Sequence, residues 1–146
     1  MKTLWAMLGA LLISIIILDL GMVYITYDKL AKVTEQALDA AITAGINPED
    51  AYLGRINIDS VSARDTALAY FRDNLGLDTN LENDILKNTQ FLISVNQDTD
   101  PHHAGTRPYL EGQVSTRVTV ISPKLFDSGG IPIRVKKTVF HRSTYK

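Results

Sequence analysis

Two histidines and two aspartates lie within one short polar segment of the chain. His102 and His103 follow Asp98 and Asp100, and imidazole and carboxylate groups are common ligands of divalent metals. A metal site needs several ligands that converge on one point, whereas the side chains of adjacent histidines point apart. The segment is therefore predicted to be a solvated loop without a metal. His141 is predicted to be a surface residue of a strand.

The 146-residue chain offers little else for catalysis. It contains no cysteine, which excludes disulfides, thiolate zinc sites, iron–sulfur clusters and cysteine nucleophiles. The sequence has no glycine-rich phosphate loop, no nucleophile elbow and no His-x-x-x-His pair, and its carboxylates are scattered. The net charge of −1 gives no indication of nucleic acid as a partner. We therefore expect neither an enzyme nor a bound cofactor.

One carboxylate is unusual because of its surroundings. Asp19 is the only charged residue between Leu4 and Ile25, and an ionisable group in an apolar helix is costly and indicates a function. One interpretation is an assembly contact, in which Asp19 meets Lys2 or the α-amine of a neighbouring copy displaced by about 26 Å along the helix axis. Such a buried pair would determine register more than stability. The alternative is that Asp19 lies near the membrane interface or is locally hydrated.

The apolar run Leu4–Ile25 has the length of a membrane-spanning helix. Its 22 residues would extend about 33 Å, close to the ~30 Å of a hydrocarbon core. A cleaved signal peptide would have a shorter apolar core followed by a small-residue cleavage site, and Leu18–Gly21 is not such a site. We therefore predict a retained membrane helix. Lysines flank it on both sides (Lys2, then Lys29 and Lys32), so charge alone does not give its orientation.

The same helix is predicted to continue as an amphipathic segment. Apolar residues recur there at helical spacing: Leu30, Val33, Ala37 and Ala41, with Leu38 and Ile42 widening the stripe. No proline occurs between Thr3 and Gly45, and Gly45 followed by Asn47-Pro48 is a helix stop signal. The prediction is one helix of about 43 residues and about 65 Å, whose second half lies against the chain's own domain.

Along this helix, ten residues are candidates for assembly or helix packing. Gly9 and Gly21 would permit close approach of a second helix, although Gly21 could equally mark a point where the helix loosens. The full set is Lys2, Trp5, Gly9, Asp19, Gly21, Tyr24, Leu30, Val33, Ala37 and Ala41.

The remainder of the chain is predicted to be a small head rich in β-structure. A short helix is expected over residues 63–75, with Ser62 and Asp65 at its N-cap and Gly76 at its C-cap. Residues 55–58 could form a short strand, and alternating apolar residues predict antiparallel strands over 89–97, 111–122 and 131–145. The fold class is therefore α+β, with a transmembrane or filament-core helix (1–26), its amphipathic continuation (27–46) and a small head domain (47–146).

The last predicted strand and the residues after it are basic. Lys136, Lys137, Arg142 and Lys146 could attract an anionic surface or nucleic acid. However, the whole chain is nearly neutral and has no aromatic stacking platform, so an edge strand protected by charge is the preferred interpretation.

The first 45 residues resemble the pilin-like proteins of tight-adherence (Tad) pili, the TadE and TadG group. In that group a leucine-rich helix ends in a Leu-Glu-Phe-Gly-like step, followed by an aromatic-containing turn and an alanine-rich amphipathic segment. The matching residues here are Leu18-Asp19-Leu20-Gly21, then Tyr24 and Tyr27, then Gln36–Ala41. Related pilins usually carry a cleaved leader and a glutamate near the start of the mature helix. This sequence has no recognisable leader, and Trp5 stands where the glutamate is expected.

The resemblance implies a structural function. We expect a subunit of an extracellular type IV pilus-like filament, with the hydrophobic helices packed in its core and the heads exposed for surface contact or adhesion. The implied partners are copies of the chain itself, a pilus assembly platform, and the cell membrane that holds the helix before assembly with the head outside. The alternative is a non-polymerising minor pilin or pseudopilin, or a single-pass membrane component of a secretion or envelope complex.

Overall fold

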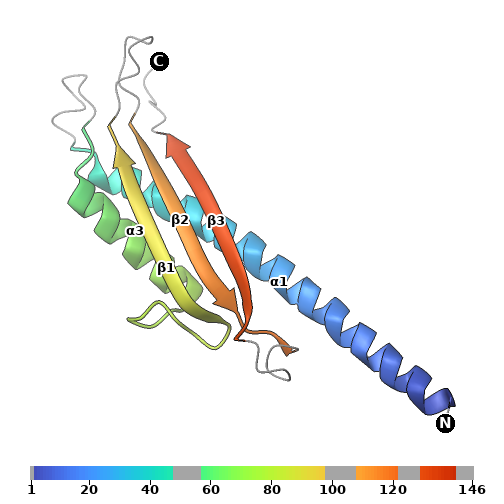
Figure 1. Cartoon of the computed structure of the whole chain (residues 1–146). Helices are drawn as coiled ribbons and strands as arrows, with labels where there is room; N and C mark the ends of the chain where they lie inside the picture. Colours follow the sequence, from blue (N-terminus) through green and yellow to red (C-terminus); the bar gives the residue numbers. More distant parts are fainter. Residues whose placement is uncertain (1, 48–56, 98–107, 122–128, 141–146) are drawn as a thin grey trace.

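A computed structural model describes residues 2–47, 57–97, 108–121 and 129–140. It has the predicted α+β architecture, in which one long N-terminal helix is followed by a short helix and a three-stranded antiparallel sheet (Figure 1). The elements are α1 (Lys2–Gly45), α3 (Ser60–Leu75), β1 (Leu86–Asn96), β2 (Tyr109–Val118) and β3 (Ile131–Phe140). The predicted helix ending at Gly45 is confirmed.

The sheet has the order β1-β2-β3, so β2 is central and β3 is an edge strand, as predicted. Val114 of β2 lies opposite Phe91 of β1 and Val135 of β3. β1 begins three residues earlier than predicted because the register shifts between Lys87 and Gln90, which interrupts the alternation on which the prediction depended. β2 ends at Val118, so the predicted extension of this strand over 119–121 is wrong; the chain leaves the sheet there, and the Ile121 N–H donates to Asp19 of α1. The predicted end of the third strand, at 145, lies outside the described residues.

α3 begins earlier than the sequence predicted. Its N-cap is Asp59, whose carboxylate accepts a hydrogen bond from the Val61 N–H at 3.0 Å, so the predicted cap at Ser62 is wrong. Asp, like Ser, is a favoured capping residue, and the first of the available candidates forms the cap. The predicted C-cap is confirmed, since Gly76 has a left-handed backbone with φ of 61°. Of the predicted strand over 55–58, the described part is Asn57 and Ile58, and Ile58 forms an isolated bridge with Ile46.

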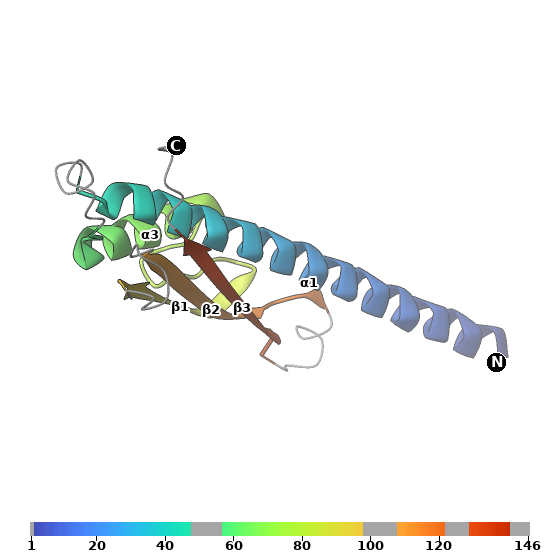
Figure 2. The same ribbon diagram turned by 90° about the horizontal axis from the view of Figure 1, so that it is seen from above.

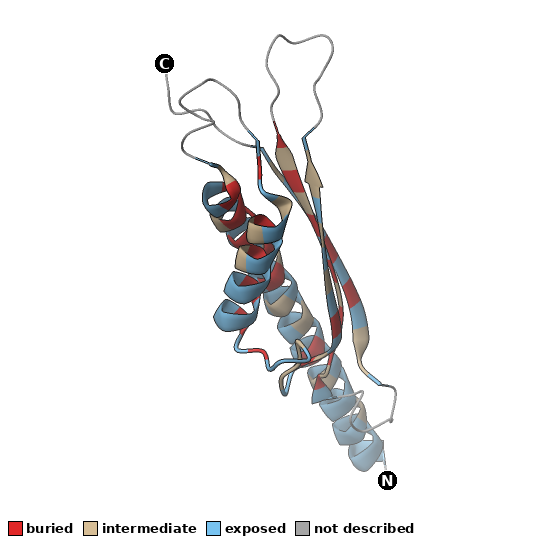
Figure 3. Ribbon diagram, turned by 90° about the vertical axis from the view of Figure 1, so that its left-hand side faces the viewer, coloured by how far each residue is buried: buried red, intermediate tan, exposed pale blue. Residues whose placement is uncertain are grey.

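Both helices cover the same face of the sheet, and the core lies between the two layers (Figures 2 and 3). The apolar stripe of α1 is buried in this core, which confirms that the second half of the helix packs on its own domain. Gly112 of β2 makes room for this packing, because a Cβ atom there would lie 3.1 Å from Leu38 Cδ1. The principal buried residues are Leu30, Leu38, Ile58, Phe71, Leu110, Val114, Val118 and Val135.

Gly45 ends α1 for a reason other than the predicted one. Among the described glycines, positive φ angles occur at Gly76, Gly129 and Gly130, so Gly45 is not a left-handed cap. A Cβ atom at Gly45 would lie 2.8 Å from Ile58 Cγ2, which is closer than real Cβ contacts. The Asp59 N–H also donates to the Gly45 carbonyl at 2.8 Å. Gly45 is therefore required for close contact between the end of α1 and the start of α3.

Candidate functional site

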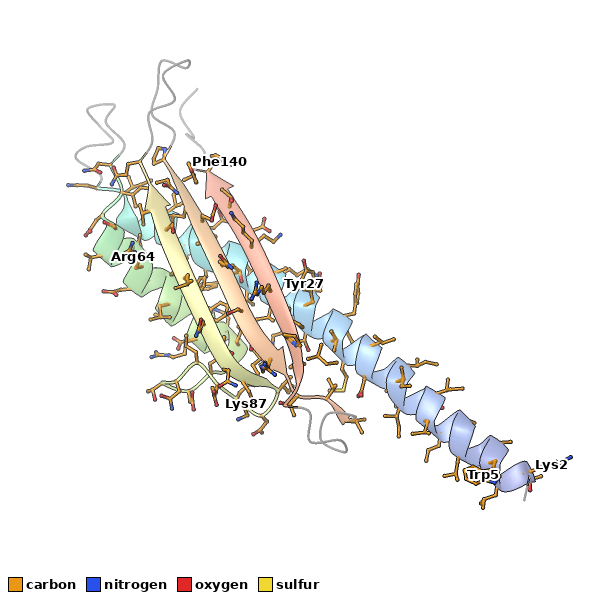
Figure 4. All side chains as sticks on the ribbon, viewed as in Figure 1. Lys2, Trp5, Tyr27, Arg64, Lys87 and Phe140 are labelled. Atoms are coloured by element: carbon orange, nitrogen blue, oxygen red, sulfur yellow. The ribbon has the colours of Figure 1, made fainter. Side chains whose placement is uncertain are left out.

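The N-terminal part of α1 extends beyond the head as an apolar rod, which we define as Lys2–Leu18 (Figures 1 and 4). Ten of its large apolar side chains are 44–72% exposed and lie on all sides of the helix. They are Leu4, Trp5, Met7, Leu8, Leu11, Leu12, Ile13, Ile16, Ile17 and Leu18. Among the described helices, α1 is long and apolar enough to cross a membrane. The rod is therefore a candidate membrane span.

Asp19, directly after the rod, is in contact with the head. Asp19 is only 3% exposed, and its Oδ1 accepts a hydrogen bond of 2.9 Å from the backbone N–H of Ile121. Ile121 belongs to the segment that follows β2, where the Thr119 N–H donates to the Ile85 carbonyl at 2.7 Å. This segment connects Asp19 to the end of the sheet. A carboxylate placed between an apolar rod and a folded head thus has a hydrogen-bond donor within the same chain.

This contact is one that sequence reasoning missed. Both interpretations of Asp19 placed its partner outside the chain, either in a neighbouring copy or in solvent. A backbone N–H can be supplied by any residue except proline, so no side-chain pattern at Ile121 identified it. Pairing with Lys2 of another copy stays a prediction. Within one chain that pairing is ruled out, because about 26 Å of straight helix separates the two residues.

The other candidate residues divide into two groups. Leu30, Val33, Ala37 and Ala41 are 0–7% exposed and pack in the core of the head. The remaining ones lie on the rod or just after it: Lys2, Trp5, Gly9, Gly21 and Tyr24. A Cβ atom at Gly9 or Gly21 would meet nothing within 4 Å, so these two positions are open to approach by another helix. Only this second group presents surface to other molecules.

The predicted domain boundary at residues 26 and 27 falls within the contact between α1 and the head. Val23 packs against the core of the head, and Asp19 is buried by it. The head thus reaches eight residues further toward the N-terminus than the start of the predicted amphipathic segment (27 minus 19).

Ion pairs occupy the described part of the basic cluster. Lys137 lies 3.0 Å from Glu35 and joins β3 to α1, while Lys136 lies 2.9 Å from Glu111 on the neighbouring strand. This arrangement agrees with a charged edge strand rather than with an unpaired basic patch. Arg142 and Lys146 lie outside the described residues.

A further ion pair lies on the exposed face of α1, in the half of the helix that packs on the head. The Lys32 ammonium is 2.7 Å from Asp28, one helical turn away. The hydrogen bond to Asp28 and its negative charge raise the pKa of Lys32 above its ordinary value. Since both side chains are largely exposed, this pair contributes little to folding.

The described ranges contain no group of three His, Asp or Glu side chains that could hold a metal ion. The histidines considered from the sequence, His102, His103 and His141, fall outside those ranges. Comparisons with protein-family models, with curated proteins and with solved structures found no match.

Proposed function

We propose that the protein is a structural subunit of an extracellular, Tad-like type IV pilus filament. In this proposal the apolar rods pack together in the filament core and the heads form its surface, where they contact other surfaces or mediate adhesion. The observation that carries the proposal is the rod itself, since ten large apolar side chains between Leu4 and Leu18 are exposed on a chain whose head is otherwise packed. Such a surface needs an apolar environment, which lipid or other rods can supply.

Two environments in succession explain an apolar helix that projects from a folded head. Before assembly the rod lies in the cell membrane, where its apolar surface is in contact with lipid and the head is outside. During assembly a membrane platform extracts the chain, and the rods of other copies replace the lipid. Close packing then depends on small residues, and Gly9 is an open position on the rod at which a second helix can approach.

The second candidate function is a non-polymerising minor pilin or single-pass component of a secretion or envelope complex. The Asp19 contact favours this alternative, because the Ile121 N–H already provides the carboxylate with a donor. A chain of this kind can remain in the membrane without a neighbour to satisfy Asp19. Neither candidate involves catalysis or a cofactor.

Fractionation and cross-linking of the cysteine-free chain separate the two candidates. Single cysteines at Leu11, Leu12 and Ile13 sample three directions around the rod, because successive helical residues are about 100° apart. Leu92→Cys is the control, since Leu92 is 63% exposed but lies on the sheet.

A filament subunit should be the dominant chain in the sheared extracellular fraction, and oxidation should cross-link it through at least one rod position. A chain that stays in the membrane fraction, with no cross-linking at any rod position, would contradict the filament and support the alternative.

A further inference from the structure

Two exposed isoleucines lie at the end of the sheet nearest the rod. Ile85 and Ile121, which we call the rim, are 42% and 41% exposed. The Ile121 N–H donates to Asp19, which places Ile121 level with Asp19, directly after the rod. The Thr119 N–H donates to the Ile85 carbonyl, so Ile85 lies next to the same segment at this end of the sheet.

We propose that the rim is a membrane-contacting surface, which enters the interfacial region of the lipid bilayer beside α1. The inference rests on the membrane-anchored state in the proposed function, but it does not require polymerisation. It assigns to this end of the head a partner, the headgroup and upper acyl region of a phospholipid bilayer.

The length of the rod carries the argument. Lys2 is charged, so the apolar part of the rod is Leu4–Leu18, which contains 15 residues (18 minus 4, plus 1) and extends about 22 Å, whereas a hydrocarbon core is about 30 Å thick. Lipid that surrounds this apolar part must then extend about 8 Å further, which is about five residues beyond Leu18. That distance includes the level of Asp19. Tilting of the helix would bring the head still closer to the lipid.

The surface of α1 continues to be apolar over this distance. Leu20, Tyr24 and Ile25 are exposed on the side of the helix away from the head. Tyr24 and Tyr27 are well placed as interfacial anchors, because tyrosine is enriched where the hydrocarbon meets the headgroups. Ile121 supplies an apolar side chain on the side of the head next to Asp19, so apolar side chains are exposed there on both α1 and the head.

Charged residues near the rim limit its depth. Asp84 is exposed directly before Ile85, and Lys87 lies 3.8 Å from Glu82 at the same end of the sheet (Figure 4). These groups need water or headgroups, so the rim reaches the interface and not the centre of the bilayer. The buried position of Asp19 fits this depth, because the head shields its carboxylate where lipid would otherwise touch it.

Depth measurements on the full chain in vesicles of phosphatidylcholine and phosphatidylglycerol test the proposal. Nitroxide labels are attached to single cysteines at Ile85 and Ile121, with Leu18→Cys as the reference on the rod. Leu92→Cys and Phe140→Cys serve as controls, since both side chains are exposed and Phe140 lies at the opposite end of the sheet. Accessibility to a water-soluble nickel relaxant is compared with accessibility to oxygen.

Labels at the rim should be several-fold less accessible to the nickel relaxant than the controls, and more accessible to oxygen. Rim labels that match the controls, while the Leu18 label is protected, would overturn the proposal and indicate that the bilayer thins around the rod instead. A Leu18 label that is fully accessible to nickel would overturn the membrane-anchored state itself.

Discussion

Substitutions at Asp19 separate its hydrogen bond within the chain from any role of its charge between chains. Asp19→Asn keeps an oxygen that can accept from the Ile121 N–H but removes the negative charge. Asp19→Ala removes both and leaves the Ile121 N–H without this acceptor. Asp39 provides the matched control, because it is an exposed carboxylate on the same helix.

The expected magnitudes follow from the geometry of the contact. The Ile121 N–H is partly buried, so the loss of its acceptor should cost about 2 kcal/mol, within the roughly 1–3 kcal/mol of an unsatisfied donor, and the better helix propensity of alanine offsets about 0.5 kcal/mol of this. Asp19→Ala should therefore lower the free energy of unfolding by about 1.5 kcal/mol. Asp19→Asn should cost less, about 1 kcal/mol, because a neutral acceptor is roughly half as strong as a charged one. At about 3 °C per kcal/mol, the expected decreases in Tm are about 5 °C and about 3 °C.

Thermal unfolding of the full chain in detergent, followed by circular dichroism, gives these values, and the yield of sheared filaments gives assembly. If assembly depends on an interchain charge pair, both variants should lose filaments equally, although Asn retains most of the stability. If assembly depends on the contact with Ile121, filament yield should decrease in the same order as Tm. Tm values equal to those of Asp39→Asn and Asp39→Ala would refute the energetic reasoning, and unchanged filament yield in both Asp19 variants would refute the assembly role.

Two further predictions concern the packing of the head, both measured by thermal or denaturant unfolding of the full chain. Gly45→Ala should destabilise the fold by about 1–2 kcal/mol, because overpacking against Ile58 and α3 exceeds the gain in helix propensity. Gly21→Ala is the control: its Cβ would meet open space, so this variant should be neutral or stabilising by up to ~1 kcal/mol. Equal effects of the two variants would contradict the close contact at Gly45. Thr89→Val and Thr116→Val should each lower the free energy of unfolding by about 1–2 kcal/mol, because each removes one partner of a buried pair of hydroxyl groups 2.7 Å apart. The double variant should lower it by less than the sum of the two single effects. Strict additivity would show that the two hydroxyl groups do not interact.

The sequence predicted those features of the fold that depend on hydrophobic periodicity. The stripe of Leu30, Val33, Ala37 and Ala41 identified the face of α1 that the head buries, and alternation identified all three strands. Periodicity is reliable here because each element buries one face only.

The features that it did not predict depend on local irregularity or on long-range backbone contacts. The start of β1 was not predicted because the register shifts between Lys87 and Gln90. The start of α3 was not predicted because Asp59, three residues before Ser62, forms the N-cap. The donor to Asp19 is separated from it by 102 residues and is a backbone group. Such a partner is specified only once the sheet has been placed against α1, so its position follows from tertiary packing and not from a motif.

The continuity of α1 has a consequence for how each copy presents its head. Core and rod share one unbroken helix, in which each residue adds about 1.5 Å of height and about 100° of rotation. Deleting one residue between Asp19 and Leu30 would turn the Asp19 carboxylate away from Ile121, whereas the same deletion near Lys2 would leave the Asp19 contact unchanged. The rotation of the head about the helix axis and its height along that axis are therefore coupled. In the proposed filament, copies whose rods are held in the same position would all turn the same side of the sheet outward.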